Sequence, residues 1–163
     1  MRTKYAKMYN VITNQNLPVK KAIRKIAFMN INKRGGKNKC NMSKLKQYAQ
    51  DYSEFIRRQI EIINPKVIVC CGNKVDNMIA NVLGFDEHVS TNISTQYCHN
   101  VKFYKKDDIL IIPMLHPTIG GHKKYSELRK GSKEERIDKY VHEFKNRFDA
   151  IKSFINAKNK TRQ

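Results

Sequence analysis

Apolar residues occur along the chain as short continuous runs and as helical stripes. Residues 66–72, KVIVCCG, are apolar on both faces and rich in β-branched side chains. Such a run predicts a parallel strand that is covered by helices and central in its sheet. In residues 42–63 the apolar positions recur every three or four residues, which predicts one amphipathic helix. Asn64 and Pro65 end this helix, because proline disfavours helix at the residue before it.

Further helical stripes and apolar runs lie before and after these elements. Residues 75–83 carry a second helical stripe, with Asn73 as a candidate N-cap and Gly84 as the C-terminal stop. Upstream, residues 1–25 form a helical N-terminal segment with a short helix that begins near Pro18. The apolar run IAFMNI, residues 26–31, predicts a strand that leads into a basic loop.

The second half of the chain predicts a hairpin and a terminal helix. The runs QYCHNVKFY and ILIIPML flank the turn-like residues 105–108. Ser132 and Glu135 form a capping box ahead of a long stripe, which predicts a C-terminal helix over residues 133–157. Alternating strands and helices predict an α/β fold, a three-layer α/β/α sandwich with a small, mainly parallel central sheet. The 163 residues predict a single domain, residues 1–163.

Charge narrows the class of partner. The chain has 33 Lys and Arg against 14 Asp and Glu, a formal net charge of +19. This excess is far larger than solubility requires and favours a polyanion, nucleic acid first, although a coding bias toward lysine explains part of it. Apolar runs are too short to cross a bilayer, and the N-terminus lacks an apolar signal segment. We therefore expect a cytoplasmic protein without membrane contact.

The four cysteines suggest no bound metal. Cys40, Cys70, Cys71 and Cys98 lack the spacing of a zinc site, and the adjacent pair lies inside the predicted strand. We expect neither disulfides nor a metal, and we interpret the cysteines as buried thiols.

Two polar segments follow predicted strands, and both would lie at one edge of a parallel sheet. Residues 30–34 follow the first strand and residues 116–122 follow the last. Ligands of open α/β sheets bind beyond the carboxyl ends of the strands, so we expect the two segments to meet in space.

Three segments carry a family resemblance. IAFMNINKRGG, INPKVIVCCGN and ILIIPMLHPTIGG occur in this order over residues 26–121. The ordered set resembles the later motifs of the uracil-DNA glycosylase superfamily. The resemblance implies a DNA glycosylase that binds duplex DNA and excises a flipped uracil or other modified base, with no cofactor.

The resemblance also implies roles for individual residues. Asn30 would read the base edge with its amide, and His116 would stabilise the negative charge of the departing base. The following loop would press into the minor groove with Ile119 as an apolar wedge. The remaining implied DNA contacts are loop residues and flanking cations: Lys33, Arg34, Lys37, Pro117, Thr118, Gly120, His122, Lys123 and Lys124.

One family feature is missing. Members of the superfamily carry a water-positioning Asp or Asn in a Gly-Pro motif upstream of the asparagine segment, and residues 1–25 contain no such motif. The cysteines also do not match the iron-sulfur branch, so we expect no cluster. Three functions therefore stay open: a glycosylase, a catalytically inactive relative that binds DNA, and an interaction protein whose basic face binds another acidic partner.

Overall fold

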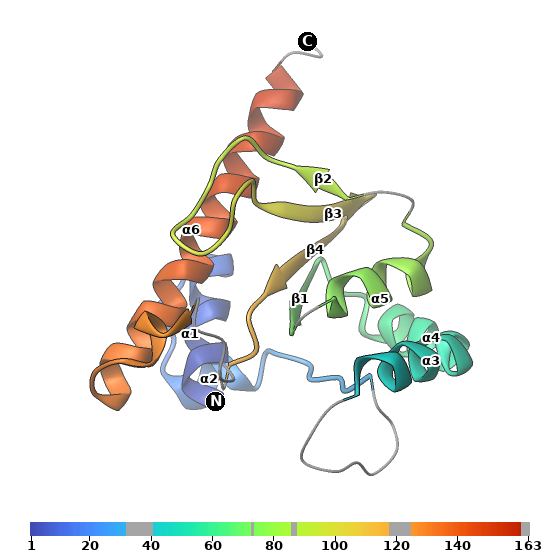
Figure 1. Ribbon diagram of the computed structural model, residues 1–163, viewed down its shortest axis with the longest axis horizontal. Coiled ribbons are helices and arrows are strands. Elements are labelled where there is room, and N and C mark those ends of the chain that lie inside the picture. Colours follow the sequence, from blue (N-terminus) through green and yellow to red (C-terminus); the bar gives the residue numbers. More distant parts are fainter. Residues whose placement is uncertain (32–40, 73, 86–87, 118–124, 161–163) are drawn as a thin grey trace.

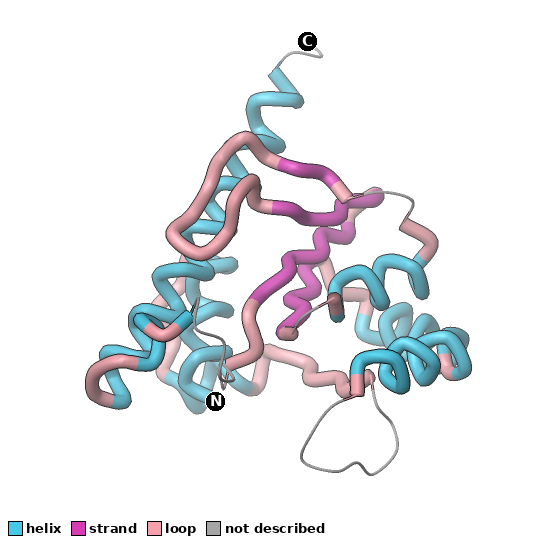
Figure 2. Tube along the Cα trace, viewed as in Figure 1, coloured by secondary structure: helices cyan, strands magenta, loops and turns pink. Residues whose placement is uncertain are grey.

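The structure is a computed structural model that describes residues 1–31, 41–72, 74–85, 88–117 and 125–160. Figure 1 labels its elements, and Figure 2 colours them by type. The described ranges form six α-helices, four strands and a 3-10 helix: α1 (Arg2–Thr13), α2 (Val19–Ile23), α3 (Met42–Asp51), α4 (Ser53–Ile63), β1 (Val67–Cys71), α5 (Val75–Leu83), β2 (Val89–Ser90), β3 (Lys102–Lys106), β4 (Ile109–Met114), η2 (Glu127–Arg129) and α6 (Lys133–Lys160). None of these helices is both long and apolar enough to cross a membrane.

Strand β4 organises the sheet, whose strand order is β1-β4-β3-β2. β1 and β4 run parallel, with Val67 opposite Leu110 and Cys71 opposite Met114. The other two pairs are antiparallel. The protein is thus a mixed α/β protein, and the prediction of a mainly parallel sheet is wrong. The hairpin of β3 and β4 is the reason, because strands joined by a tight turn must run antiparallel and the hairpin occupies one edge of β4.

The predicted hairpin itself is confirmed, with its turn at Asp107 in a left-handed conformation. β1 is a strand parallel to β4, as predicted, but it is an edge strand of the sheet and not a central one. It nevertheless contributes side chains to both faces: Val67 and Val69 face one core and Ile68 the other. Its apolar composition therefore reports two covered faces, which an end strand can also have.

Helices cover both faces of the sheet, and each face has its own hydrophobic core (Figure 1). On the side of α1 and α6 lies the α6 core, which includes Phe103, Ile112, Met114, Tyr140, Phe144 and Ile151. On the side of α3, α4 and α5 lies the α5 core, which includes Leu45, Ile56, Ile60, Ile79 and Ile111. Successive β4 residues point to opposite cores, as the two-residue period of a strand requires.

The predicted single helix over residues 42–63 is two helices. α3 ends at Asp51, because the φ of −109° and ψ of 19° of Tyr52 leave the helical region, and α4 begins at Ser53. The break allows both helices to direct their apolar stripes into the α5 core. The predicted end is correct: Asn64 is a left-handed C-cap followed by Pro65.

The predicted strand over residues 26–31 does not form. The segment is irregular: Ile31 is buried in the α5 core, Met29 packs against it, and Phe28 is 58% exposed. Its sequence resembles a strand because it is apolar. Its apolar side chains are instead divided between the α5 core and the surface, because the segment links α2 on one side of the sheet to α3 on the other (Figure 1).

Helix ends follow the sequence signals where they are described. The backbone N–H of Ser132 donates to Glu135 Oε2 at 2.6 Å and the N–H of Glu135 donates to Ser132 Oγ at 3.2 Å, which confirms the capping box. Gly84 ends α5 with a φ of 70°, where glycine has no steric penalty. The proposed cap Asn73 lies outside the described residues.

Candidate functional site

The parallel strands β1 and β4 have their carboxyl ends at the same edge of the sheet. Cys71 and Met114 are paired at the last position of the two strands. The chain continues from β4 into Leu115, His116 and Pro117. His116 is exposed, whereas Pro117 is buried. His116 therefore stands at the carboxyl edge, the position at which open α/β sheets bind ligands.

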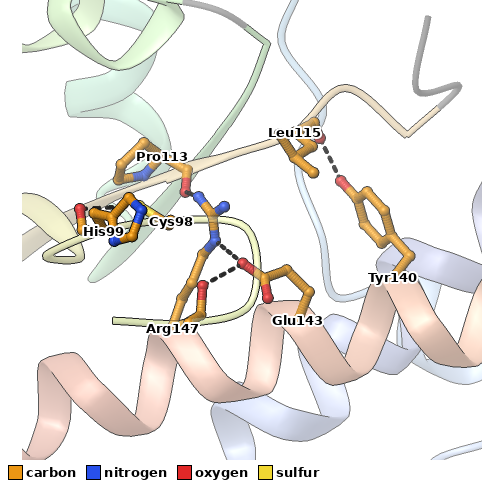
Figure 3. Close-up of polar contacts among 8 residues, drawn as sticks. Cys98, His99, Pro113, Leu115, Tyr140, Glu143 and Arg147 are labelled. Atoms are coloured by element: carbon orange, nitrogen blue, oxygen red, sulfur yellow. Dashed lines mark hydrogen bonds and ion pairs between the residues drawn. The ribbon is translucent and has the colours of Figure 1, made fainter. Parts of the chain in front are cut away.

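Side chains from two helices hold the backbone on both sides of His116. Tyr140 of α6 donates its hydroxyl hydrogen to the Leu115 carbonyl at 2.5 Å (Figure 3). Lys4 of α1 donates from Nζ to the Pro117 carbonyl at 2.7 Å. The carbonyls that precede and follow His116 are thus both fixed. An exposed histidine on a fixed backbone is the geometry that a preorganised ligand contact requires.

Lys4 and Tyr140 also contact each other. Lys4 Nζ lies 4.4 Å from the centroid of the Tyr140 ring, a cation–π arrangement. Burial, and secondarily the nearby Arg136, lowers the pKa of Lys4. Burial raises the pKa of Tyr140, with the neighbouring Cys71 thiol adding to the effect. Tyr140 therefore keeps its proton at neutral pH and remains a donor to Leu115.

A buried pair of charged side chains, Glu143 and Arg147, contacts β4 at Pro113, two residues before Leu115. Arg147 Nε donates to Glu143 Oε1 at 2.7 Å, and Arg147 also donates to the Pro113 carbonyl at 3.2 Å (Figure 3). Thr95 donates its hydroxyl to the same Glu143 oxygen at 2.7 Å. Both charged side chains are buried, Glu143 at 2% exposed and Arg147 at 5%. The pair links α6, β4 and the loop before β3.

Asn30 is exposed and lies between two residues that contact the α5 core, Met29 and Ile31. Leu115, next to His116, packs instead against the α6 core. The residues that flank Asn30 and His116 thus pack on opposite faces of the sheet. The structure does not place the two segments in one core, although both belong to the connections around its carboxyl edge.

Phe28 links the Asn30 segment to α1. Its ring contacts Tyr5 edge-on, with centroids 4.9 Å apart. Tyr5 packs against the α6 core, and burial raises its pKa, with Cys71 of β1 as a secondary cause. The segment therefore contacts α1 at Phe28 and continues to the α5 core.

Most of the implied DNA contacts lie outside the described residues: Lys33, Arg34, Lys37, Thr118, Ile119, Gly120, His122, Lys123 and Lys124. Pro117 is described, and its carbonyl accepts the Lys4 hydrogen bond. Within the described ranges, α2 and the two residues after it carry four exposed cations: Lys20, Lys21, Arg24 and Lys25.

Lys4 and Tyr140 were not identified from the sequence. Tyr140 appears there as one more apolar position in the α6 stripe, and Lys4 as one more surface lysine. The sequence feature that could have identified them is a lysine or tyrosine on the buried side of a predicted helix. Such a buried polar group is expected to form a hydrogen bond.

The thiols at the carboxyl edge favour a structural role. Cys70 is buried, and Cys71 and Cys98 are partly exposed; all three are free thiols, and Cys40 lies outside the described residues. Burial raises the pKa of Cys71 to about 11, so its thiol stays protonated and unreactive at neutral pH. The described residues contain no group of three His, Cys, Asp or Glu side chains that could hold a metal ion.

A cavity of about 180 Å³ lies elsewhere, between α6, η2 and the loop before β3. Tyr97, Glu127 and His142 are among its lining residues, whereas Asn30 and His116 are not. The carboxyl edge and this cavity are separate features of the described surface.

Comparison with known proteins gives no match to this chain among family models, curated proteins or solved structures.

Proposed function

We propose that the protein binds DNA and excises a flipped uracil or other modified base by hydrolysis of its N-glycosidic bond. The observation that carries the proposal is His116, exposed at the carboxyl edge of β4 with the carbonyls on both sides held by Tyr140 and Lys4. Supporting features are the net charge of +19 and the three segments that resemble the uracil-DNA glycosylase superfamily. Helices on both faces of a small sheet suit the three-layer fold that the alternation of strands and helices predicts.

In this proposal His116 acts on the leaving base. Negative charge develops on a base oxygen as the glycosidic bond breaks, and a hydrogen bond from a fixed side chain stabilises that charge most in the transition state. The polar contacts of Tyr140 and Lys4 would keep the histidine from moving as charge develops. Asn30 would contact the hydrogen-bonding edge of the base with its amide donor and acceptor.

The test is base excision from duplexes that contain uracil, hypoxanthine or hydroxymethyluracil. His116→Ala should lower the excision rate by on the order of a hundredfold or more, because one transition-state donor is lost. Affinity for the same duplex should change little. His142→Ala is the matched control, since His142 is exposed on α6 and lines the separate cavity. Equal loss in both variants, or an unchanged rate in His116→Ala, would contradict the role of His116.

Asn30 tests the specificity part of the proposal. Asn30→Asp replaces the amide donor by an acceptor and should shift preference toward bases that offer an amino group, or abolish excision. Competing excision of several modified bases by both proteins measures the shift. Identical preferences would show that Asn30 does not contact the base.

A second candidate is a catalytically inactive relative that binds DNA. It is favoured by the packing of the Asn30 and His116 segments on opposite faces and by the missing upstream motif. DNA affinity that falls steeply with salt, without excision of any modified base, would support this candidate, because counterion release depends on phosphate contacts alone.

A further inference from the structure

Phe28 presents an aromatic ring to solvent in a strongly basic part of the chain. Its side chain is 58% exposed, although the edge of the ring contacts Tyr5. A single exposed apolar side chain is ordinary on protein surfaces, so exposure by itself carries no function. The way the ring is held and the charge around it carry the argument.

The backbone around Phe28 is anchored on both sides. Upstream, Ala22 of α2 is fully buried, and Tyr5 packs against the α6 core while it contacts Phe28. Downstream, Met29 packs against the α5 core and Ile31 is buried in it. The segment thus runs from α2 to the α5 core, and Phe28 is its one large apolar side chain that stays exposed. Phe28 is exposed by the path of an anchored chain, and holding the ring there lowers the entropy cost of binding a ligand.

The charge along the chain on both sides of Phe28 has one sign. Residues 1–50 contain no Asp or Glu, so every ionised side chain in this stretch is cationic. Four of these cations are exposed within eight residues of Phe28: Lys20, Lys21, Arg24 and Lys25. An acidic protein surface would satisfy the cations and could also bury a phenylalanine, but it presents no series of flat faces to stack on the ring.

Single-stranded nucleic acid matches both features. Its phosphates suit a cluster of cations, and its unpaired bases stack on exposed aromatic rings. The bases of an intact duplex are stacked on each other, so a duplex offers its phosphates but no free base face. An anionic membrane is a poorer match, since α2 has five residues and cannot form an extended amphipathic face.

We propose that Phe28 is a stacking platform for an unpaired base of single-stranded DNA, with the cations of α2 and the two residues after it on the adjacent phosphates. The inference deepens the proposed function and rests on it for the identity of the polymer. It places an unpaired nucleotide beside α1, through the contact between Phe28 and Tyr5.

The experiment measures binding of a labelled oligothymidylate, a duplex of the same length, and a strand of that length made of abasic nucleotides. Four proteins are compared: wild type, Phe28→Ala, Phe28→Tyr and Phe55→Ala. Phe55 is the matched control because it is an exposed phenylalanine of α4, 68% exposed, that lies among both acidic and basic neighbours. Thermal melting measures whether each variant is folded. We expect all of them to fold, because both phenylalanine side chains are exposed.

Phe28→Ala should weaken oligothymidylate binding by about 5- to 150-fold, the range for one lost base stack of roughly 1–3 kcal/mol. The slope of affinity against salt should not change, because the phosphate contacts remain. Phe28→Tyr should bind like wild type, since it keeps the ring, and Phe55→Ala should also bind like wild type. On the abasic strand, Phe28→Ala and wild type should bind equally, because no base remains to stack.

Three results would overturn the inference. The first is that Phe28→Ala binds oligothymidylate as tightly as wild type does. The second is that Phe28→Ala loses the same factor in affinity for the single strand and for the duplex. The third is a loss on anionic vesicles of phosphatidylserine without a loss on the oligonucleotide, which would make lipid the partner. These results leave His116-dependent excision standing. The proposed function fails separately, if wild type excises no base and binds neither form of DNA at low salt.

Discussion

The two faces of the sheet are stabilised in different ways. On the α6 side, the buried side chains include three charged groups, Lys4, Glu143 and Arg147, beside the large aromatic residues of α6. On the α5 side, the core of the described residues consists of aliphatic and small side chains with Tyr104 and Phe85 at its margin. Burial of charge is costly unless each group is paired and hydrogen-bonded. The buried charges on the α6 side carry this desolvation cost, so the contacts of these side chains must offset it.

The pairing of β4 explains these contacts. β3 pairs with β4 through Ile111 and not beyond, so the carbonyls of Pro113 and Leu115 extend past the antiparallel ladder. Arg147 and Tyr140 donate to these two carbonyls from α6. A backbone carbonyl left buried and unpaired would cost free energy comparable to a lost hydrogen bond. The α6 face thus fixes the path of β4 toward His116, whereas the α5 face contributes apolar burial.

The largest effect should follow from breaking the buried ion pair. Glu143→Ala leaves the Arg147 guanidinium buried without its carboxylate, and we expect a loss of about 3–5 kcal/mol in the free energy of unfolding. Urea denaturation measures it. The double variant Glu143→Leu with Arg147→Met should recover much of the loss, because it removes both charges. A loss below about 1 kcal/mol in Glu143→Ala would show that the pair is solvated in solution.

Ile56→Ala tests the α5 face with a purely apolar change. Ile56 is fully buried in α4, and the resulting cavity should cost about 2–5 kcal/mol. Because no polar contact to β4 is lost, we expect the excision rate per folded molecule to stay at the wild-type value. A rate that falls in step with stability would show that the α5 face also positions the site.

Local patterns predicted the individual elements better than their arrangement. The β3–β4 hairpin, the capping box of Ser132 and the stop at Gly84 depend on neighbouring residues, and all three were predicted correctly. The position of β1 in the sheet depends on which strands pair with the two edges of β4, and no pattern within residues 66–72 indicates it. The same limit explains residues 26–31, where an apolar run packs against the α5 core without pairing as a strand.

The candidate site was only partly predictable for a related reason. His116 was identified because it follows an apolar strand. The groups that hold its backbone, Lys4 and Tyr140, come from helices at the two ends of the chain. Their partners are backbone carbonyls, and a carbonyl has no signature in a sequence. Sequence patterns identified the exposed residue and missed the residues that position it.

Tyr140→Phe tests the link between α6 and the site with a single oxygen atom. The change leaves the Leu115 carbonyl without its hydroxyl donor and should cost about 1–3 kcal/mol. Unlike Ile56→Ala, it should also slow the proposed base excision, because the backbone before His116 is released. The measurements are urea denaturation and excision under single-turnover conditions. An unchanged rate would restrict Tyr140 to a role in stability.

Alkaline pH should destabilise the sheet through the thiols of β1. Folding raises the pKa of Cys71 from 9.0 to about 11, so between these values the folded state holds a proton that the unfolded state has lost. The free energy of unfolding therefore falls as pH rises from 9 to 11, by on the order of 1–2 kcal/mol for Cys71. Lys4 works in the opposite direction below pH 10.5, since burial lowers its pKa. Urea denaturation at pH 9 and pH 11 should show a smaller fall in Cys71→Ala than in wild type.

The smallest effect should come from an ion pair on the outer face of α6. Lys145 and Asp149 have the same four-residue spacing as Glu143 and Arg147, with Nζ and Oδ2 2.6 Å apart, but their side chains are 57% and 50% exposed. Water screens the exposed pair and both long side chains lose freedom in forming it, so Lys145→Ala should cost about 0.3–0.5 kcal/mol. The cost should shrink further at high salt, whereas that of Glu143→Ala should not. A double-mutant cycle with Asp149→Ala isolates the pair energy. A value near that of the buried pair would mean that burial is not what separates the inner and outer faces of α6.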